Sequence, residues 1–120
     1  MKNVSRIDTV FVPVTNVGKS EEWYLKMFQF RIVYRSNDGQ YVGFRFDQEG
    51  PLQCGLTIYK CEAIPEQKHI PFNFYVSDVE EMHRMLKESN VWVSDIHEGE
   101  GMKFFDFADP DGNVLGAVTF

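Results

Sequence analysis

The sequence predicts an α+β fold in which two βαβββ modules, arranged in tandem, form curved mixed sheets around a groove. The first observation is an internal repeat: a shift of 62 residues places Gly39–Ile58 under Gly101–Phe120, with Gly39 on Gly101 (101 − 39 = 62). The second is that the same order of expected strands and helix occurs in both halves. The third is size, because a unit of about 60 residues buries so little apolar surface that it is only marginally stable alone, which favours packing of the two modules together.

The composition fits one soluble globular domain spanning residues 1–120. The chain is 43% apolar and 15% aromatic, which is ample for a packed core. Its apolar runs are far shorter than the ~20 residues of a membrane helix, and its N-terminal residues lack the apolar region of a secretory signal. We therefore expect no membrane partner. The domain contains module 1 at about residues 4–60 and module 2 at about residues 66–120.

Charge and cysteine content exclude further classes. A net charge of −6 argues against a nucleic-acid partner, since binding to the phosphate backbone depends on clustered Lys and Arg. The two cysteines, Cys54 and Cys61, do not have the spacing of a metal or redox motif. These observations predict a reduced, cytoplasmic protein.

The first module is expected to contain a strand, a helix and three further strands. Asn16 is a suitable N-cap for a helix that ends near Phe28, and Asn37–Gly39 has the composition of a turn. In the first strand, Thr9 and Phe11 lie on one face by alternation. The expected strands are Val4–Val14, Phe30–Tyr34, Gln40–Phe46 and Leu52–Tyr59.

The second module repeats this order after a linker at Lys60–Lys68. Asp78 occupies the position equivalent to Asn16, and Glu81 three residues later completes a start that resembles a capping box. Pro110 and Gly112 favour a turn between the last two strands. The expected strands are His69–Val76, Val91–Ile96 and the two arms of the Gly101–Phe120 hairpin, with a polar loop at His97–Gly101.

Two stretches resemble a known family. They are Ile7–Val14, followed by Asn16 and by a helix with Trp23-Tyr24, and the segment Phe107–Asn113, which reads Phe-Ala-Asp-Pro-Asp-Gly-Asn. Together with the paired βαβββ repeat they are similar to the vicinal oxygen chelate superfamily. That superfamily includes glyoxalase I, extradiol dioxygenases, fosfomycin-resistance enzymes and bleomycin-resistance proteins. The resemblance covers nearly the whole chain and implies a glyoxalase/bleomycin-resistance-like fold.

The resemblance also implies four metal-ligand positions, one on the first and one on the fourth strand of each module. In this sequence they are occupied by Thr9, Cys54, Pro71 and Gly116. Only Cys54 is a good ligand for a transition metal, and a catalytic metal needs about three protein donors. We therefore expect no metal and no other cofactor.

Strand alternation predicts which side chains line the groove. If Ala108 pairs with Asn113, then Phe105 pairs with Gly116, and the corresponding rule in module 1 pairs Gly43 with Cys54 and turns Leu56 inward. The result is an aromatic surface with a few polar groups, as in many small-molecule pockets. The predicted ligand-binding residues are Thr9, Phe11, Tyr41, Arg45, Cys54, His69, Asn73, Tyr75, Lys103, Phe105 and Phe107.

Each polar candidate also has a structural interpretation. His69 is either an acid, base or ligand in the groove or a solvated residue at a strand end, and Cys54 is either a nucleophile or a small core residue. Arg45 and Lys103 either hold an anionic group or form exposed ion pairs. Asn73 and Tyr75 orient a ligand or bond to neighbouring backbone. His83 and His97 receive no role.

The sequence is compatible with three functions. The leading hypothesis, which leans against an enzyme, is a metal-free protein that holds an aromatic or amphipathic small molecule. The alternative is a glyoxalase-like lyase, or another enzyme of the superfamily, with a displaced metal site or metal-free acid–base chemistry. The third is a structural or regulatory subunit whose groove is filled by its own side chains. The resemblance also implies a homodimer, with which the aromatic side chains of Trp23 and Trp92 are compatible.

Overall fold

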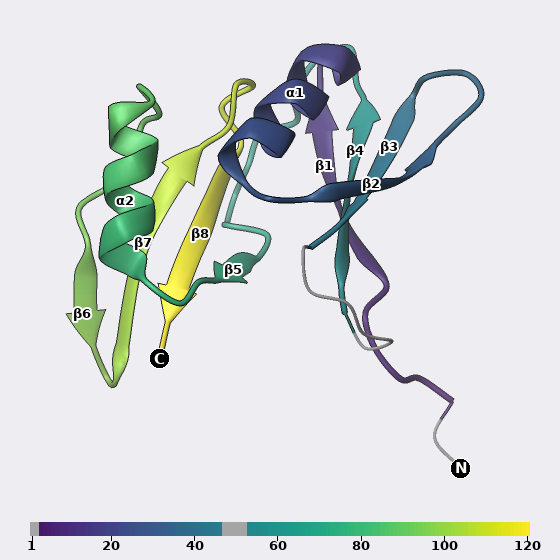
Figure 1. Cartoon of the computed structure of the whole chain (residues 1–120). Helices are drawn as coiled ribbons and strands as arrows, with labels where there is room; N and C mark the ends of the chain where they lie inside the picture. The colour runs from purple at the N-terminus through teal and green to yellow at the C-terminus, as the bar shows by residue number, and fades with distance from the viewer. Residues whose placement is uncertain (1–2, 47–52) are drawn as a thin grey trace. The chain divides into compact units, whose positions relative to one another are not determined.

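The computed structural model describes residues 3–46 and 53–120. The chain divides into two compact units, unit 1 at Met1–Pro65 and unit 2 at Glu66–Phe120. Each unit contains one four-stranded mixed sheet and one α-helix, so the predicted α+β class and the duplicated βαβββ order are confirmed (Figure 1). No helix among the described residues is long and apolar enough to cross a membrane.

Unit 1 places its strands in the order β1-β4-β3-β2, with β1 parallel to β4 and the other pairs antiparallel. The helix α1 starts where predicted, because Asn16 Oδ1 accepts a hydrogen bond from the Lys19 N–H at 3.0 Å. Its buried Tyr24 ring lies 6.2 Å from the ring of Phe44, which fixes α1 on one face of the sheet. The elements are β1 (Thr9–Val14), α1 (Val17–Met27), β2 (Arg31–Arg35), β3 (Tyr41–Arg45) and β4 (Gly55–Lys60).

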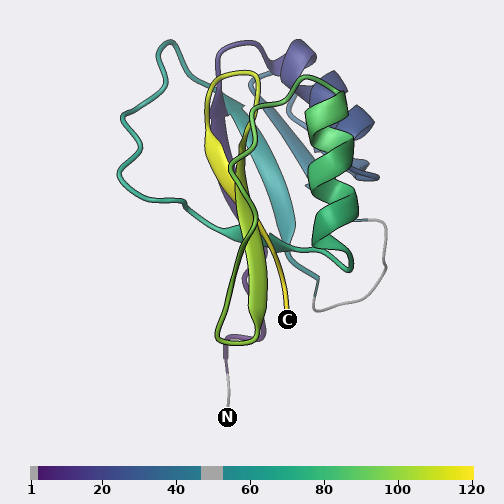
Figure 2. The same ribbon diagram turned by 90° about the vertical axis from the view of Figure 1, so that its left-hand side faces the viewer.

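Unit 2 repeats the arrangement with the order β5-β8-β7-β6. Asp78 caps α2 by accepting a hydrogen bond from the Glu81 N–H at 3.0 Å. The helix lies on one side of the sheet, and its His83 ring packs edge-on against Phe105 at 5.0 Å (Figure 2). The elements are β5 (Asn73–Tyr75), α2 (Val79–Glu88), β6 (His97–Gly99), β7 (Met102–Ala108) and β8 (Val114–Thr119).

The turn between β7 and β8 is built on the buried carboxylate of Asp109. Its Oδ1 accepts hydrogen bonds from the Asp111 N–H at 3.0 Å and from the Asn113 N–H at 2.9 Å, and its Oδ2 accepts one from Asn113 Nδ2 at 2.9 Å. Gly112 adopts φ +82°, a conformation that glycine reaches without strain. Because Asn113 belongs to this network, the first cross-strand pair is Ala108 with Val114 and not Ala108 with Asn113.

Several predicted strand limits are corrected. The first strand begins at Thr9 instead of Val4, and the first strand of unit 2 is shorter than predicted. The strand expected at Val91–Ile96 is wrong, since only Val93 forms a bridge there, and β6 lies in the segment that was expected to be a loop. The start of the strand expected at Leu52–Tyr59 falls partly outside the described residues.

The spacing between equivalent residues of the two units is not 62 along the whole module. Phe11 pairs with Thr57 in unit 1, and Asn73 pairs with Gly116 in unit 2. Phe11 and Asn73 are 62 apart (73 − 11), whereas Thr57 and Gly116 are only 59 apart (116 − 57). In sequence, nine residues (46–54) separate the paired ends of the last two strands in unit 1, and five (109–113) separate them in unit 2. Gly116 is therefore equivalent to Thr57, and the predicted equivalence with Cys54 is wrong.

Candidate functional site

Each sheet has one face covered by the helix of its own unit and one face that the helix leaves uncovered, which we call the open face. The pairing of β1, β4, β3 and β2 settles which side chains of unit 1 share it, because directly paired residues project to the same side. The open face of unit 1 consists of three rows of residues: Thr9, Gly55, Arg45 and Arg31; then Phe11, Thr57, Gly43 and Tyr34; then Pro13, Tyr59 and Tyr41.

The middle row has small residues between large ones. Thr57 and Gly43 lie between the rings of Phe11 and Tyr34, each of which is 56% exposed. A Cβ atom on Gly43 would lie 3.4 Å from Tyr34 Cβ and 3.7 Å from Thr57 Oγ1. Because Gly43 has no side chain and that of Thr57 is short, these two residues are the low part of the row between the two rings, and we call this part the hollow.

Further aromatic rings border this hollow. The Tyr59 ring meets the ring of Phe11 edge-on at 6.4 Å and stacks with that of Tyr41 at 6.3 Å. These contacts fix three rings side by side across β1, β4 and β3. Packed rings of this kind form a rigid apolar surface suited to a flat ligand.

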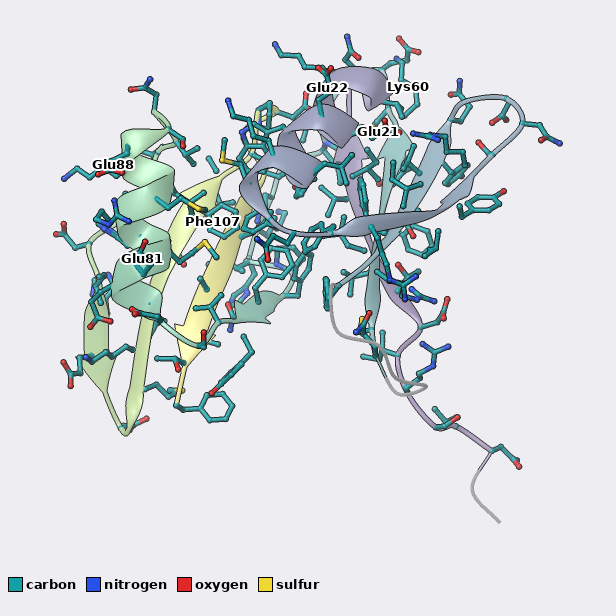
Figure 3. The ribbon with its side chains drawn as sticks, in the orientation of Figure 1. Glu21, Glu22, Lys60, Glu81, Glu88 and Phe107 are labelled. Atoms are coloured by element: carbon teal, nitrogen blue, oxygen red, sulfur yellow. The ribbon has the colours of Figure 1, made fainter. Side chains whose placement is uncertain are left out.

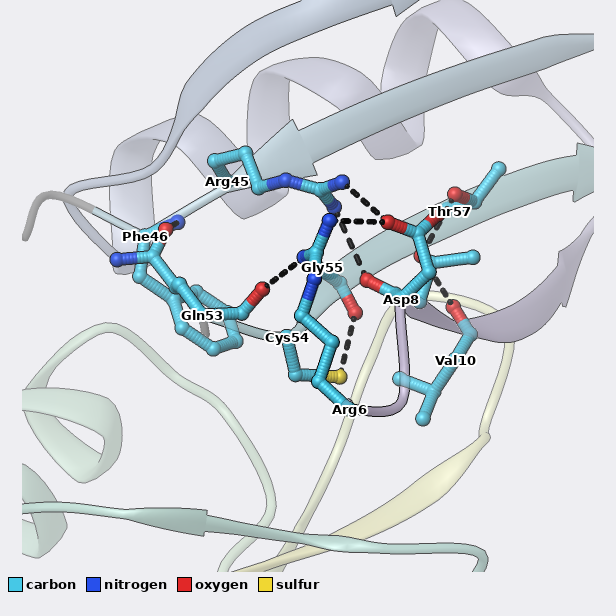
Figure 4. Close-up of polar contacts among 10 residues, drawn as sticks. Arg6, Asp8, Val10, Arg45, Phe46, Gln53, Cys54, Gly55 and Thr57 are labelled. Carbon is cyan, nitrogen blue, oxygen red and sulfur yellow. Dashed lines mark hydrogen bonds and ion pairs between the residues drawn. The ribbon is translucent and has the colours of Figure 1, made fainter. Parts of the chain in front are cut away.

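The first row gives one end of the open face polar character (Figure 4). Thr9 Oγ1 and Thr57 Oγ1 share a hydrogen bond of 2.9 Å. The Arg45 side chain passes over Gly55, where a Cβ atom would overlap its guanidinium. Arg45 donates to the Asp8 carbonyl oxygen at 3.1 Å and to Asp8 Oδ1 at 2.8 Å.

Arg6 approaches the same carboxylate, with its Nη2 3.1 Å from Asp8 Oδ1, and its Nη1 donates to the Gln53 carbonyl oxygen at 2.6 Å. Among the described residues, two guanidinium groups therefore share the Asp8 carboxylate. Arg45 therefore forms an ion pair, as one of its two interpretations predicted, and it also lies beside the hollow.

The open face of unit 2 follows from its own pairing. One row contains Asn73, Gly116 and Asp106, the next contains Tyr75, Val118, Phe104 and His97, and Val114 with Ala108 completes the face. The amide oxygen of Asn73 lies over Gly116, in the space that a Cβ atom there would need. Asn73 and Tyr75 are thus on the open face, as predicted.

Three predicted groove residues of unit 2 point the other way. Phe105 and Phe107 pair with Ala117 and Leu115, are fully buried, and lie on the face that α2 covers; Figure 3 labels Phe107. Lys103 has the same parity and donates to Glu80 Oε1 at 2.7 Å. This contact lowers the pKa of the Glu80 carboxyl and raises the pKa of Lys103. The prediction failed because the turn contains Asn113, which moves the pairing by one residue and reverses the faces.

Three other predicted groove residues either lie on the helix-covered face or lie outside the strands. Leu56 is fully buried opposite Phe44, on the helix-covered face of unit 1. Cys54 precedes β4, and its thiol donates to the Gly55 carbonyl oxygen at 3.3 Å. His69 precedes β5, is exposed, and has its Nδ1 2.8 Å from the Ile70 carbonyl oxygen. Thr9, Phe11, Tyr41 and Arg45 are on the open face as predicted.

The open faces also contain residues that the sequence analysis missed. They include Tyr34, Thr57 and Tyr59 in unit 1, and Phe104 and Asp106 in unit 2. A usable signal was present for the last two, because the face holding Phe105, Phe107, Leu115 and Ala117 is entirely apolar and is the better core. No comparable signal marked Tyr34, since β2 changes register between Ile32 and Tyr34.

The side chains at the implied metal-ligand positions do not fit a metal. With Thr57 in place of Cys54, the four residues are Thr9, Thr57, Pro71 and Gly116. The two threonine hydroxyls are bonded to each other, and Asn73 covers Gly116. Across residues 3–46 and 53–120, no group of three or more His, Cys, Asp and Glu side chains is arranged to hold a metal ion.

A separate cleft of about 680 Å³ lies in unit 2 between the start of α2 and the β6–β7 hairpin. Its charged lining is mainly acidic, and its one lysine, Lys103, is paired with Glu80. The N-terminal end of α2 is already capped by Asp78. The open faces, which combine aromatic surface with hydrogen-bonding groups, are the better candidates for a ligand site.

Comparisons with known proteins agree with this fold. A family model described as "Glyoxalase/Bleomycin resistance protein/Dioxygenase superfamily" matches residues 6–116. Among solved structures, TnmS3, an antibiotic binding protein from Streptomyces sp. CB03234, has a TM-score of 0.82 at 20% identity, covering 99% of this chain and 98% of that chain. A superfamily member from Sphaerobacter thermophilus DSM 20745 has a TM-score of 0.80 at 16% identity, with 98% of each chain covered. Lactoylglutathione lyase from Agrobacterium tumefaciens has a TM-score of 0.73 at 21% identity, covering 98% of this chain and 96% of that chain.

Proposed function

Starting from the fact that this chain belongs to the Glyoxalase/Bleomycin resistance protein/Dioxygenase superfamily, we propose that it binds an aromatic or amphipathic small molecule on the open face of unit 1 without a metal. The observation that carries the proposal is the hollow over Gly43 and Thr57, bordered by the rings of Phe11, Tyr34 and Tyr59. A structural neighbour that is an antibiotic binding protein supports a binding role.

The chemistry of the face favours a flat ligand with one polar end. A ligand ring that contacts several protein rings gains about 0.5–1.5 kcal/mol per aromatic pair beyond the burial of its area. Because Gly43 has no side chain, a ligand ring placed there would lie against the backbone of β3. Arg45 and the hydroxyls of Thr9 and Thr57 then lie on the side where a polar or anionic substituent of the ligand would be placed.

A thermal-shift screen against aromatic antibiotics, quinones and glutathione conjugates tests this proposal. A ligand that binds the folded state raises the unfolding midpoint by mass action. Phe11→Ala should abolish most of the shift, because it removes one wall of the hollow. Phe120→Ala is the matched control: both rings are exposed and each contacts one tyrosine, but Phe120 lies outside this face. Equal losses in the two variants, or no shift with any compound, would count against the proposal.

The metal-free part of the proposal rests on the donor set at the four positions. Elemental analysis of untagged protein, purified with and without added Ni, Zn, Mn and Fe, should find no stoichiometric metal. His69→Ala provides the contrast, because a displaced metal site of a glyoxalase-like enzyme would draw on this histidine. A stoichiometric metal that this substitution removes would favour the enzyme and overturn the metal-free binding function.

A homodimer is part of the same proposal. The Trp92 ring is 56% exposed and so is accessible to a partner, whereas Trp23 is only partly exposed. Sedimentation across a dilution series should show a dimer that dissociates at low concentration, whereas a monomer at every concentration would refute it. The cytoplasmic location expected from the sequence stays a prediction.

A further inference from the structure

We infer that the open face of unit 2 contains a subsite for a protonated amine, formed by the carboxylate of Asp106 and the amide of Asn73. Asp106 was not among the predicted groove residues, and the inference does not depend on the ligand site of unit 1. It follows from the geometry of one row of the sheet, from two polar side chains that lack partners among the described residues, and from the charge of the unit.

The row places the two polar groups on either side of a glycine. Asn73 on β5 and Asp106 on β7 both pair with Gly116 on β8, so their Cα atoms are about two strand spacings, or roughly 9–10 Å, apart. Gly116 has no side chain to separate them, and the Asn73 amide oxygen leans over it. A small group lying beside the Asn73 amide, on the side that faces Asp106, can therefore contact both side chains. An ammonium group, which has three hydrogen-bond donors, suits two oxygen acceptors arranged in this way.

Neither polar group is satisfied within the part of the chain that the structure describes. Among residues 3–46 and 53–120, the side chains of Asn73 and Asp106 have no hydrogen-bond or ion-pair partner. Asp106 is half-buried, and its backbone N–H donates to Ser94 Oγ at 2.9 Å, which fixes the residue without using its carboxylate. A partly buried, unpaired carboxylate is costly, and a cationic donor removes that cost through charge-assisted hydrogen bonds.

Aromatic rings flank the polar row. Phe104 lies two residues from Asp106 on the same face and is 38% exposed, and Tyr75 stands in the same relation to Asn73 and is 60% exposed. The Tyr75 hydroxyl donates to the Phe120 carbonyl oxygen at 3.3 Å, and the two rings meet edge-on at 5.1 Å, so Tyr75 is held in place. Ring faces beside a carboxylate attract organic cations by cation–π contact.

The charge of unit 2 favours the same ligand. Residues 66–120 contain eleven Asp and Glu against four Lys and Arg, a net charge of −7, whereas residues 1–65 contain seven against eight, a net charge of +1. Lys103 is the cationic residue nearest to Asp106 along β7. It projects to the helix-covered face and is paired with Glu80. Long-range attraction therefore concentrates cations at unit 2.

The test compares phenethylamine, which is protonated at about pH 7, with phenethyl alcohol, which has the same ring and chain but no charge. Titrations of isotope-labelled protein, followed by the amide signals of Gly116 and Val118, give both affinities. The amine should bind more tightly than the alcohol by about tenfold or more. Asp106→Asn, which keeps the shape of the side chain, should abolish this preference.

Asp95→Asn is the matched control, because it removes the same charge from an exposed position in unit 2. It should leave the preference within about twofold of the wild-type value. Asn73→Ala offers a second variant and should weaken amine binding without removing the preference for a cation. The inference is overturned if Asp106→Asn and Asp95→Asn behave alike, or if the amine leaves the Gly116 and Val118 signals unchanged. Amine binding at these signals with no aromatic ligand on unit 1 would instead reject only the proposed function.

Discussion

The two units place different side chains at equivalent points of the same sheet. Where unit 1 has Phe11, Thr57 and Gly43 in its central row, unit 2 has Asn73, Gly116 and Asp106. The first row forms a hollow with an aromatic wall, and the second forms a polar pair in which the Asn73 amide lies over Gly116. The comparison teaches that this fold specifies where a ligand can lie on each sheet, while a few side chains at fixed positions decide which ligand chemistry is accepted.

The largest expected effect tests the register that defines both faces. Phe105→Ala should lower the free energy of unfolding by about 3–5 kcal/mol, because it leaves a cavity under α2. Phe104→Ala, one residue away and on the open face, should cost about 1 kcal/mol or less. Urea unfolding of both variants measures the difference. Similar costs for the two would show that the faces are assigned wrongly.

A smaller effect is expected on binding when the hollow of unit 1 is filled. Gly43→Val should lower the affinity for an aromatic ligand by about tenfold, since its methyl groups occupy the space above Thr57. Gly99→Val is the control, because Gly99 is also a strand glycine and a Cβ atom added to it would have no neighbouring atom within 4 Å. Calorimetric titration with the best compound of the screen measures both affinities. Unchanged affinity in Gly43→Val would show that the ligand does not bind at the hollow.

The ion pair at the polar end of unit 1 should contribute modestly to stability. Arg45→Met is expected to cost about 1 kcal/mol or less, because the Asp8 side chain is 65% exposed and keeps Arg6 as a partner. Urea unfolding at low and at high salt measures this cost, which should shrink as salt screens the pair. A cost several times larger would mean that Arg45 has a structural role beyond this ion pair.

The smallest effect concerns pH and the helix-covered side of unit 2. Hydrogen bonding to Lys103 lowers the pKa of Glu80, so the pair stabilises the fold above the unfolded-state pKa of this carboxyl and loses that effect as pH falls through the lower folded-state pKa. Lys103→Met should flatten the acid limb of the unfolding midpoint plotted against pH. Lys87→Met, at an exposed position of α2, should leave it unchanged. Parallel acid limbs for wild type and Lys103→Met would contradict this pair.

Local sequence signals predicted the elements better than the pairing between them. The caps at Asn16 and Asp78 were predictable because each needs only a side-chain oxygen at the right distance from a backbone N–H. The register of β7 and β8 was not, because the choice between a four- and a five-residue turn depends on how the Asp109 carboxylate is satisfied in three dimensions. Because the predicted pairing was wrong by one residue, Phe105 was placed on the open face, where the structure has Phe104.

Errors in the predicted strand pairing also changed which residues were assigned to the candidate site. In unit 1, Tyr41 and Arg45 were placed correctly, but their partners on β4 were not, since the predicted pair of Gly43 with Cys54 differs from the observed pair with Thr57 by three residues. An odd difference reverses the face of a strand, so Leu56 was exchanged for Thr57. Asp106 escaped notice for the corresponding reason in unit 2.

The most direct test of the account is a map of amide chemical shifts during titration with the best aromatic compound of the screen. The large changes should concentrate at Gly43, Thr57 and Tyr41, and Phe11→Ala should suppress them. Changes confined to the helix-covered faces, or an unchanged spectrum at saturating compound, would contradict the claim that the open face of unit 1 is a ligand-binding surface.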